Sequence, residues 1–165
     1  MLTQYRKTVC LSLISVDLPI YSVVETAATL YQKDRNRFHL LLSEPPVNNL
    51  DSENINSLTQ EDSVESSNNN QQWWMEMAPE QAIMTIQGNG RLSYRHFWQQ
   101  EAYGRTRYWL PNESTQKNEP IRLHNFTRHL TLRGDPLPEH LRIEYELWAG
   151  EVQLGSYILN LEIRH

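Results

Sequence analysis

The sequence predicts an α+β fold, in which a mostly antiparallel β-sheet of about six to seven strands carries one N-terminal helix on one face. Two observations lead to this prediction. Most segments after residue 80 alternate apolar and polar side chains with a period of two, which is typical of strands with one buried face. One segment near the N-terminus instead spaces its apolar residues by three and four positions, which is typical of an amphipathic helix.

The helical spacing lies between two predicted strands. Residues 5–16 and 37–42 have the alternation of strands, whereas residues 19–33 place apolar side chains along one helical stripe. Proline at the start of this segment suits the first turn of a helix. A β-α-β unit over 1–43 is too small to bury a core by itself, so we expect it to pack against residues 73–165 within one domain. The stripe comprises Ile20, Val23, Val24, Ala27, Leu30 and Tyr31.

Residues 44–72 have the composition of a flexible acidic linker rich in Asn and Ser. This segment contains 6 Asp or Glu residues and no Lys, Arg or aromatic residue. Such a segment has too few apolar side chains to offset the entropy lost on ordering. The whole chain has a formal charge of -5. Because the linker contributes about -6 of this, the remaining residues are close to neutral, and the chain lacks the strong positive charge typical of nucleic-acid-binding domains.

The C-terminal part, residues 73–165, is predicted to contain five or six mostly antiparallel strands. Its clearest element is a hairpin in which residues 141–148 and 152–163 alternate around a turn at Ala149–Glu151. The alternation changes phase within the second strand, and a bulge at Gly155–Ser156 would correct it by inserting one extra residue.

The candidate binding residues lie in the segment 91–109, where arginines and aromatic rings alternate. Aromatic and arginine side chains dominate the binding energy of many protein interfaces. Rings that stack on bases, with guanidinium groups on phosphates, are also a common way of holding single-stranded nucleic acid. The plain alternative is that the even-numbered rings are core and the arginines are ordinary solvated side chains. The predicted binding set is Arg95, Trp98, Arg105, Arg107, Tyr108 and Trp109.

Three functions remain open from the sequence. The first is a non-enzymatic protein-binding or regulatory module that uses this aromatic-arginine segment and binds an unidentified protein partner. The second is a single-stranded nucleic-acid-binding protein that uses the same residues. The third is a small-ligand carrier or enzyme with an aromatic pocket lined by Trp73, Trp74 and Trp98. No catalytic motif is present in the sequence, so an enzyme is not favoured.

No cofactor or metal ion is expected. His124 and His129 lie five positions apart in one predicted strand, which would place them on opposite faces. The single cysteine, Cys10, excludes an intrachain disulfide, which favours a reducing compartment and a cytoplasmic location. No apolar run reaches the roughly 20 residues that a membrane span needs. The oligomeric state is not predicted.

Overall fold

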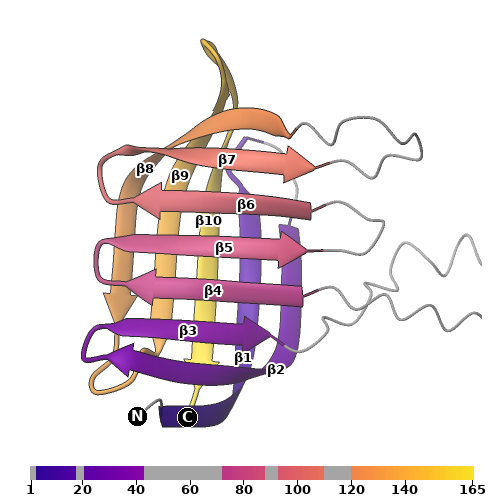
Figure 1. Cartoon of the computed structure of the whole chain (residues 1–165). Helices are drawn as coiled ribbons and strands as arrows, with labels where there is room; N and C mark the ends of the chain where they lie inside the picture. The colour runs from indigo at the N-terminus through magenta and orange to yellow at the C-terminus, as the bar shows by residue number, and fades with distance from the viewer. Residues whose placement is uncertain (1–2, 18–20, 43–71, 88–92, 110–119) are drawn as a thin grey trace, which may run out of the picture.

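The fold is a closed antiparallel β-barrel of ten strands (Figure 1). A computed structural model describes residues 3–17, 21–42, 72–87, 93–109 and 120–165. None of these residues is helical. The predicted α+β class is therefore wrong, and the described chain is all-β.

Nearly all neighbours in the barrel are also neighbours in sequence, and the first and last strands close it. The strand order around the barrel is β1-β10-β9-β8-β7-β6-β5-β4-β3-β2, and each strand pairs antiparallel with the next. The strands are β1 (Thr3–Ser15), β2 (Tyr21–Asp34), β3 (Arg37–Leu42), β4 (Gln72–Ala78), β5 (Gln81–Gln87), β6 (Ser93–Gln99), β7 (Tyr103–Trp109), β8 (Ile121–Arg133), β9 (His140–Ala149) and β10 (Val152–Arg164).

The predicted helix over residues 19–33 is replaced by strand β2. Val24, Ala28 and Leu30 are buried, whereas Tyr21 and Val23 are exposed. The buried side chains therefore occupy even positions, as in a strand with one face toward a core. Val and Thr are β-branched residues that favour extended backbone. The apolar positions in this segment are compatible with both a helical period and a strand period. Antiparallel pairing with β1 and β3 makes the segment a strand.

The predicted strand count was too low, although several individual strands are confirmed. The strand predicted over residues 37–42 matches β3, and the predicted hairpin matches β9 and β10. The additional strands include β2, which was predicted to be a helix, and β4. Because β1 pairs with β10 as well as with β2, the sheet has no free edge there and closes into a barrel.

Side chains that point into the barrel form one hydrophobic core. Alternate residues of nine of the ten strands, all except β7, contribute to this core, and alternation is how a barrel divides its inner and outer faces. Most of the largest fully buried side chains are apolar: Trp98, Leu30, Leu40, Met75, Met77, Ile86, Leu141, Ile143, Leu161 and Val9.

Two bulges change which residues face inward. In β10 the register shifts between Gln153 and Gly155, so a bulge is present with Leu154 as the extra residue, just before the predicted position at Gly155–Ser156. In β8 the register shifts between Thr127 and His129. Each bulge inserts one residue and restores the apolar side chains that follow it to the inside.

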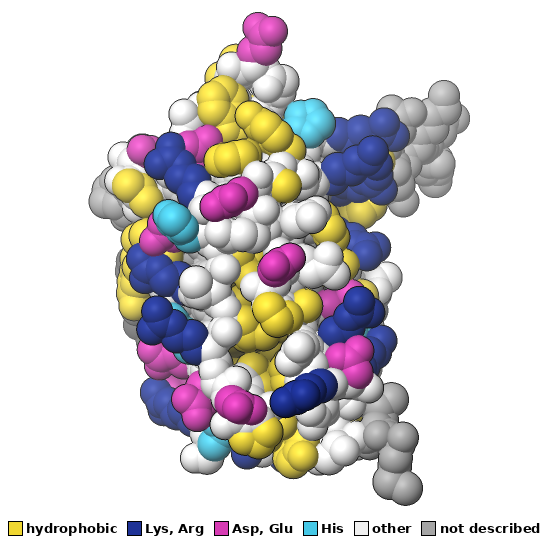
Figure 2. All heavy atoms as spheres, turned by 90° about the vertical axis from the view of Figure 1, so that its left-hand side faces the viewer, with side chains coloured by type: hydrophobic (Ala, Val, Ile, Leu, Met, Phe, Trp, Pro, Cys, Tyr) yellow, Lys and Arg dark blue, Asp and Glu magenta, His cyan; other side chains and the backbone are white. Residues whose placement is uncertain are grey.

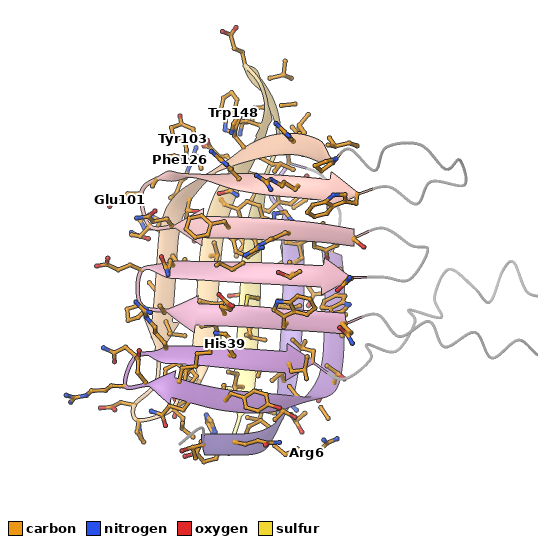
Figure 3. The ribbon with its side chains drawn as sticks, viewed as in Figure 1. Arg6, His39, Glu101, Tyr103, Phe126 and Trp148 are labelled. Atoms are coloured by element: carbon orange, nitrogen blue, oxygen red, sulfur yellow. The ribbon has the colours of Figure 1, made fainter. Side chains whose placement is uncertain are left out.

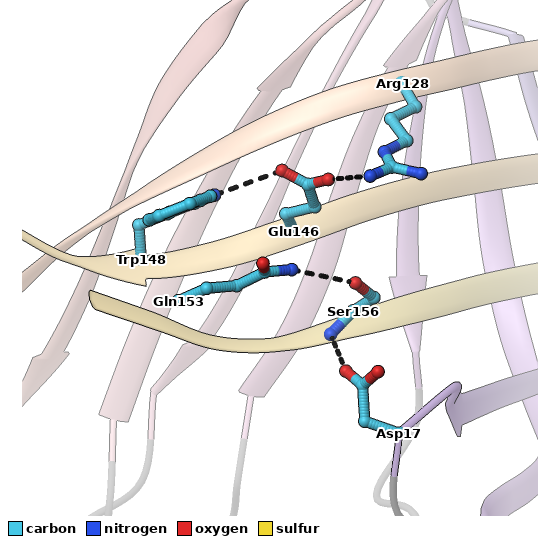
Figure 4. Close-up of polar contacts among 6 residues, drawn as sticks. All are labelled: Asp17, Arg128, Glu146, Trp148, Gln153 and Ser156. Atoms are coloured by element: carbon cyan, nitrogen blue, oxygen red, sulfur yellow. Dashed lines mark hydrogen bonds and ion pairs between the residues drawn. The ribbon is translucent and has the colours of Figure 1, made fainter. Parts of the chain in front are cut away.

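Polar contacts fix the end of the β9–β10 hairpin against the rest of the barrel (Figure 4). Glu146 accepts hydrogen bonds from the guanidinium of Arg128 and from the indole N–H of Trp148. On the other strand, the backbone N–H of Ser156 donates to the Asp17 carboxylate at 2.7 Å. These contacts orient Trp148 on the outer face, where it becomes part of the surface described below.

The two predicted parts of the domain, 1–43 and 73–165, contribute to one continuous sheet. β3 pairs with β4 from Phe38 opposite Met77 to Leu42 opposite Trp73. Most of the predicted linker, residues 44–71, lies outside the described residues, while Gln72 already belongs to β4. No helix of a length and hydrophobicity suited to crossing a membrane occurs in the described part of the chain.

Candidate binding surface on the outer face of β6 to β9

Three arginines lie side by side across β6, β7 and β8 on the outside of the barrel. Arg95 is directly opposite Arg107, and Arg107 is directly opposite Arg122. Opposite residues in antiparallel strands have Cα atoms about 4.5–5.5 Å apart. Their neighbours Tyr94 and Thr106 face the core, so alternation directs the arginines outward. Arg95, Arg107 and Arg122 are called the arginine row.

Two further rows follow along the strands toward the β6–β7 turn. The middle row contains Arg105, His124 and Trp148. Arg105 in β7 is opposite His124 in β8, and His124 is opposite Trp148 in β9. The last row, called the aromatic row, contains Tyr103 and Phe126, and Figure 3 shows these two residues close to Trp148. The rings of Tyr103 and Phe126 are in contact, with centroids 5.0 Å apart. The same outer face therefore carries positive charge in the arginine row and ring surface in the aromatic row.

Two shallow depressions lie on this face. One has a volume of about 380 Å³ and contains side chains from the arginine and aromatic rows. The second has a volume of about 250 Å³ and continues from it toward β8. The first is lined by Arg95, Phe97, Tyr103, Gly104, Arg105 and Arg107. The second is lined by Arg105, Thr106, Arg107, Arg122, Leu123 and His124.

The arginines of this surface have no acidic partner among the described residues. Elsewhere on the barrel, Arg37, Arg128, Arg142 and Arg164 each lie within 4.0 Å of an Asp or Glu carboxylate. Arginines directly opposite each other repel and weaken the strand pairing. Figure 2 shows dark blue Lys and Arg side chains gathered at the upper right of the face in view. This positive charge is available to an anionic partner.

The structure divides the six predicted binding residues between the two faces of the sheet. Arg95 and Arg105 are exposed on the outer face, and Arg107 is half-buried beside them. Trp98 is 0% exposed and belongs to the core, so it cannot contact a partner directly. Tyr108 also points inward, beside His96. Trp109 is half-buried and lies opposite Ser93.

The inward-facing members belong to a polar and aromatic cluster inside the barrel. His96 stacks on Trp98 with ring centroids 4.9 Å apart and contacts Tyr94 and Tyr108 edge-on. His96 Nδ1 is hydrogen-bonded to the Thr106 hydroxyl at 3.0 Å. Burial lowers the pKa of His96 to about 3, because charging the ring there would remove hydration without replacing it. Burial also raises the pKa of Tyr108 to about 12.

The sequence prediction missed the contribution of β8 and β9 to this surface. Arg122, His124 and Phe126 alternate in β8, and Trp148 follows in β9. Alternation in residues 121–133 could have identified the first three as one face, but not which strand they pair with. Pairing of β8 with β7 brings them beside the arginines predicted from residues 91–109.

Two other predicted arrangements differ from the structure. Trp98 is part of the core and Trp73 packs against it. Trp74 follows Trp73 directly in β4, so its side chain points to the opposite face of the sheet. The three rings therefore do not line one pocket. The bulge in β8 places His124 and His129 both on exposed positions rather than on opposite faces. The described residues contain no group of three His, Cys, Asp or Glu side chains suited to a metal ion.

Comparison with known proteins identifies the fold and not a family. No family model and no curated protein matches the sequence. Among solved structures, the chain is similar to the crystal structure of the YwiB protein from Bacillus subtilis, with a TM-score of 0.59 and 13% sequence identity. The similarity covers 98% of this chain and 94% of that chain. At this identity the comparison supports the barrel architecture over the whole chain.

Proposed function

We propose that this protein is a non-enzymatic binding module that holds a protein partner on the outer face of β6 to β9. The observation that carries the proposal is that aromatic rings and arginines with no acidic partner among the described residues line the same depression. Arg, Tyr and Trp are the residue types that contribute most to binding at protein interfaces. A partner segment with acidic and apolar side chains would complement this surface.

A protein partner is favoured over single-stranded nucleic acid by the overall charge. Nucleic acid presents a continuous line of negative phosphates, and its binding depends mainly on a broad positive field. This chain has a formal charge of -5, and four of its described arginines, Arg95, Arg105, Arg107 and Arg122, lie together on this one face. A local acidic segment of a protein needs only that face. Nucleic-acid binding is the alternative outcome of the experiments below.

The experiment that tests the proposal is charge reversal of Arg107, the central member of the arginine row. Arg107→Glu should reduce capture of partner proteins from a lysate of the source organism at least tenfold, because a central charged contact becomes repulsive. Capture is quantified by mass spectrometry of material bound to the immobilised full chain. Thermal unfolding of the same variant verifies that the barrel remains folded.

The matched control is Arg6→Glu, which makes the same charge change on β1. Figure 3 shows Arg6 at the opposite end of the barrel from Tyr103 and Phe126. Arg6 is exposed, as are Arg95 and Arg105. The control should leave capture unchanged. Equal loss in both variants would show that net charge rather than this surface holds the partner, and the proposal would fail.

We also propose a cytoplasmic location for this activity. The support is the single cysteine, which allows no intrachain disulfide. Fractionation of cells that express the tagged full chain tests this location, and recovery in a secreted or membrane fraction would contradict it.

A further inference from the structure

We infer that the arginine row recognises a phosphorylated side chain of the partner, and that the aromatic row holds an apolar residue about four positions away in the same extended segment. This inference rests on the proposed function, because it specifies the chemistry of the partner at the same surface. It depends on the row arrangement, which pairing of three strands creates.

The arginine row suits a group with several negative oxygens. Arg95, Arg107 and Arg122 come from three neighbouring strands, so their guanidinium groups can approach one anion from different directions. A phosphate monoester carries a charge of about −1.5 to −2 at pH 7 and three acceptor oxygens. A carboxylate carries one charge and two oxygens. Guanidinium forks bind phosphate in bidentate geometry, and arginine clusters are a recurring means of recognising phosphorylated segments.

The surroundings of the row favour this ligand further. Arg107 lies between two like charges, and none of the three has a described carboxylate partner. A dianion between them would replace repulsion with attraction. Arg105, in the middle row, adds a further positive charge beside the same anion.

The aromatic row fixes the second feature of the partner. Tyr103 and Arg107 are four residues apart on the outer side of β7. At about 3.3–3.4 Å per residue this spacing is about 13 Å. An extended peptide that runs along β7 covers the same distance in four residues and presents both side chains to the barrel. Tyr103 is 72% exposed, and with Phe126 it offers ring surface for an apolar side chain.

The test measures binding of the full chain to labelled peptide pools by fluorescence anisotropy. Each 12-residue pool has one fixed phosphoserine and one phenylalanine four positions before or after it, with other positions varied. Matched pools carry serine or glutamate in place of phosphoserine. We expect the phosphoserine pool to bind at least tenfold more tightly than the serine pool and several-fold more tightly than the glutamate pool. Equal affinity for the phosphoserine and glutamate pools overturns the inference.

Variants assign the two features to their rows. Arg107→Gln should remove the preference for phosphoserine, while Arg6→Gln should retain it. Phe126→Ala should weaken binding of the pools that contain phenylalanine and leave unchanged a phosphoserine pool with glycine at that position. Unchanged preference in Arg107→Gln, or equal weakening of both pools by Phe126→Ala, contradicts the arrangement.

Two further arms separate this inference from its alternatives. A 12-nucleotide single-stranded DNA that binds more tightly than the phosphoserine pool, and depends on Arg107, would identify nucleic acid as the partner and overturn the inference. Phosphatase treatment of the lysate should abolish Arg107-dependent capture. Capture that still depends on Arg107 after that treatment would refute phosphate recognition and leave the proposed function standing. Capture that never depends on Arg107 refutes both.

Discussion

Trp98 shows most clearly how the alternation of side chains along a strand places some residues in the core and their neighbours on the surface. Its neighbour Phe97 lines the outer depression, whereas Trp98 is fully buried and stacks on His96. Two adjacent aromatic residues in one strand therefore have different roles, because successive side chains point to opposite faces. An aromatic-rich segment of this kind is partly core and partly surface.

We expect Trp98→Ala to destabilise the barrel by about 3–5 kcal/mol, the range found when a large buried ring is truncated. Arg95→Ala, three residues away on the exposed face, should change the free energy of unfolding by less than about 0.5 kcal/mol. Urea unfolding monitored by far-UV circular dichroism measures the free energy of unfolding of both variants. Similar losses in the two variants would contradict the assignment of Trp98 to the core.

His96 makes the stability of the barrel depend on pH. Its pKa is about 3 in the folded chain and near the ordinary histidine value of 6.5 when unfolded. Its stabilising contribution is complete above pH 6.5 and is lost as the pH falls from 6.5 toward 3, because only the unfolded chain then binds the proton. The expected loss is about 1.4 kcal/mol per pH unit within that window.

The variant His96→Gln should unfold with a smaller loss of stability between pH 6.5 and pH 5 than the wild-type chain. The difference in slope isolates His96 from the carboxylates, which titrate in both proteins. His124→Gln, on the exposed outer face, is the matched control. A slope that does not change in His96→Gln would show that the ring is not held neutral in the core.

At the scale of elements, the end of β6 lies unusually close to β7. A Cβ atom added at Gly104 would lie 1.9 Å from the backbone carbonyl oxygen of Phe97 and 2.9 Å from Asn125 Oδ1. The Asn125 side-chain amide donates to that same carbonyl at 3.0 Å. Glycine is therefore required for this close approach.

Gly104→Ala should destabilise the barrel by about 2–4 kcal/mol, because the contact is with backbone that cannot rotate away. Gly150→Ala is a matched control at the β9–β10 turn, where an added Cβ meets no atom within 4 Å, although its φ of 61° carries its own cost. Thermal unfolding of both variants measures the difference. A smaller loss at Gly104 than at Gly150 would contradict the close approach.

At the scale of the whole molecule, β10 closes the barrel. It pairs with β1 on one side and β9 on the other, and Leu159, Leu161 and Ile163 contribute to the core. Removal of β10 would expose two strand edges and this apolar surface. The barrel should therefore depend on β10 for cooperative folding.

A variant that lacks residues 151–165 should lose its cooperative thermal transition and its dispersed amide spectrum, and it should associate through the exposed edges. Addition of a synthetic peptide with the sequence of residues 151–165 should restore part of the dispersed spectrum. A monomeric variant with an unchanged transition would show that closure by β10 is not needed for the fold.

The sequence by itself determined the strands whose alternation was regular, including β3 and the β9–β10 hairpin. It also determined the cluster of arginines and rings in residues 91–109. These features are local, since a period of two needs only neighbouring residues. The sequence did not determine β2, because Val24, Ala28 and Leu30 fit a strand while Ile20, Val23 and Ala27 complete a helical stripe.

Only the tertiary structure decided that the sheet closes and which residues share the outer face. Pairing of β1 with β10 joins residues about 150 positions apart, and no local pattern encodes that contact. The same applies to Arg122, His124 and Trp148, which reach the arginines of β6 and β7 only through strand pairing. Burial of one face of each strand selected the pairing, and that pairing placed unpaired charge and exposed rings together.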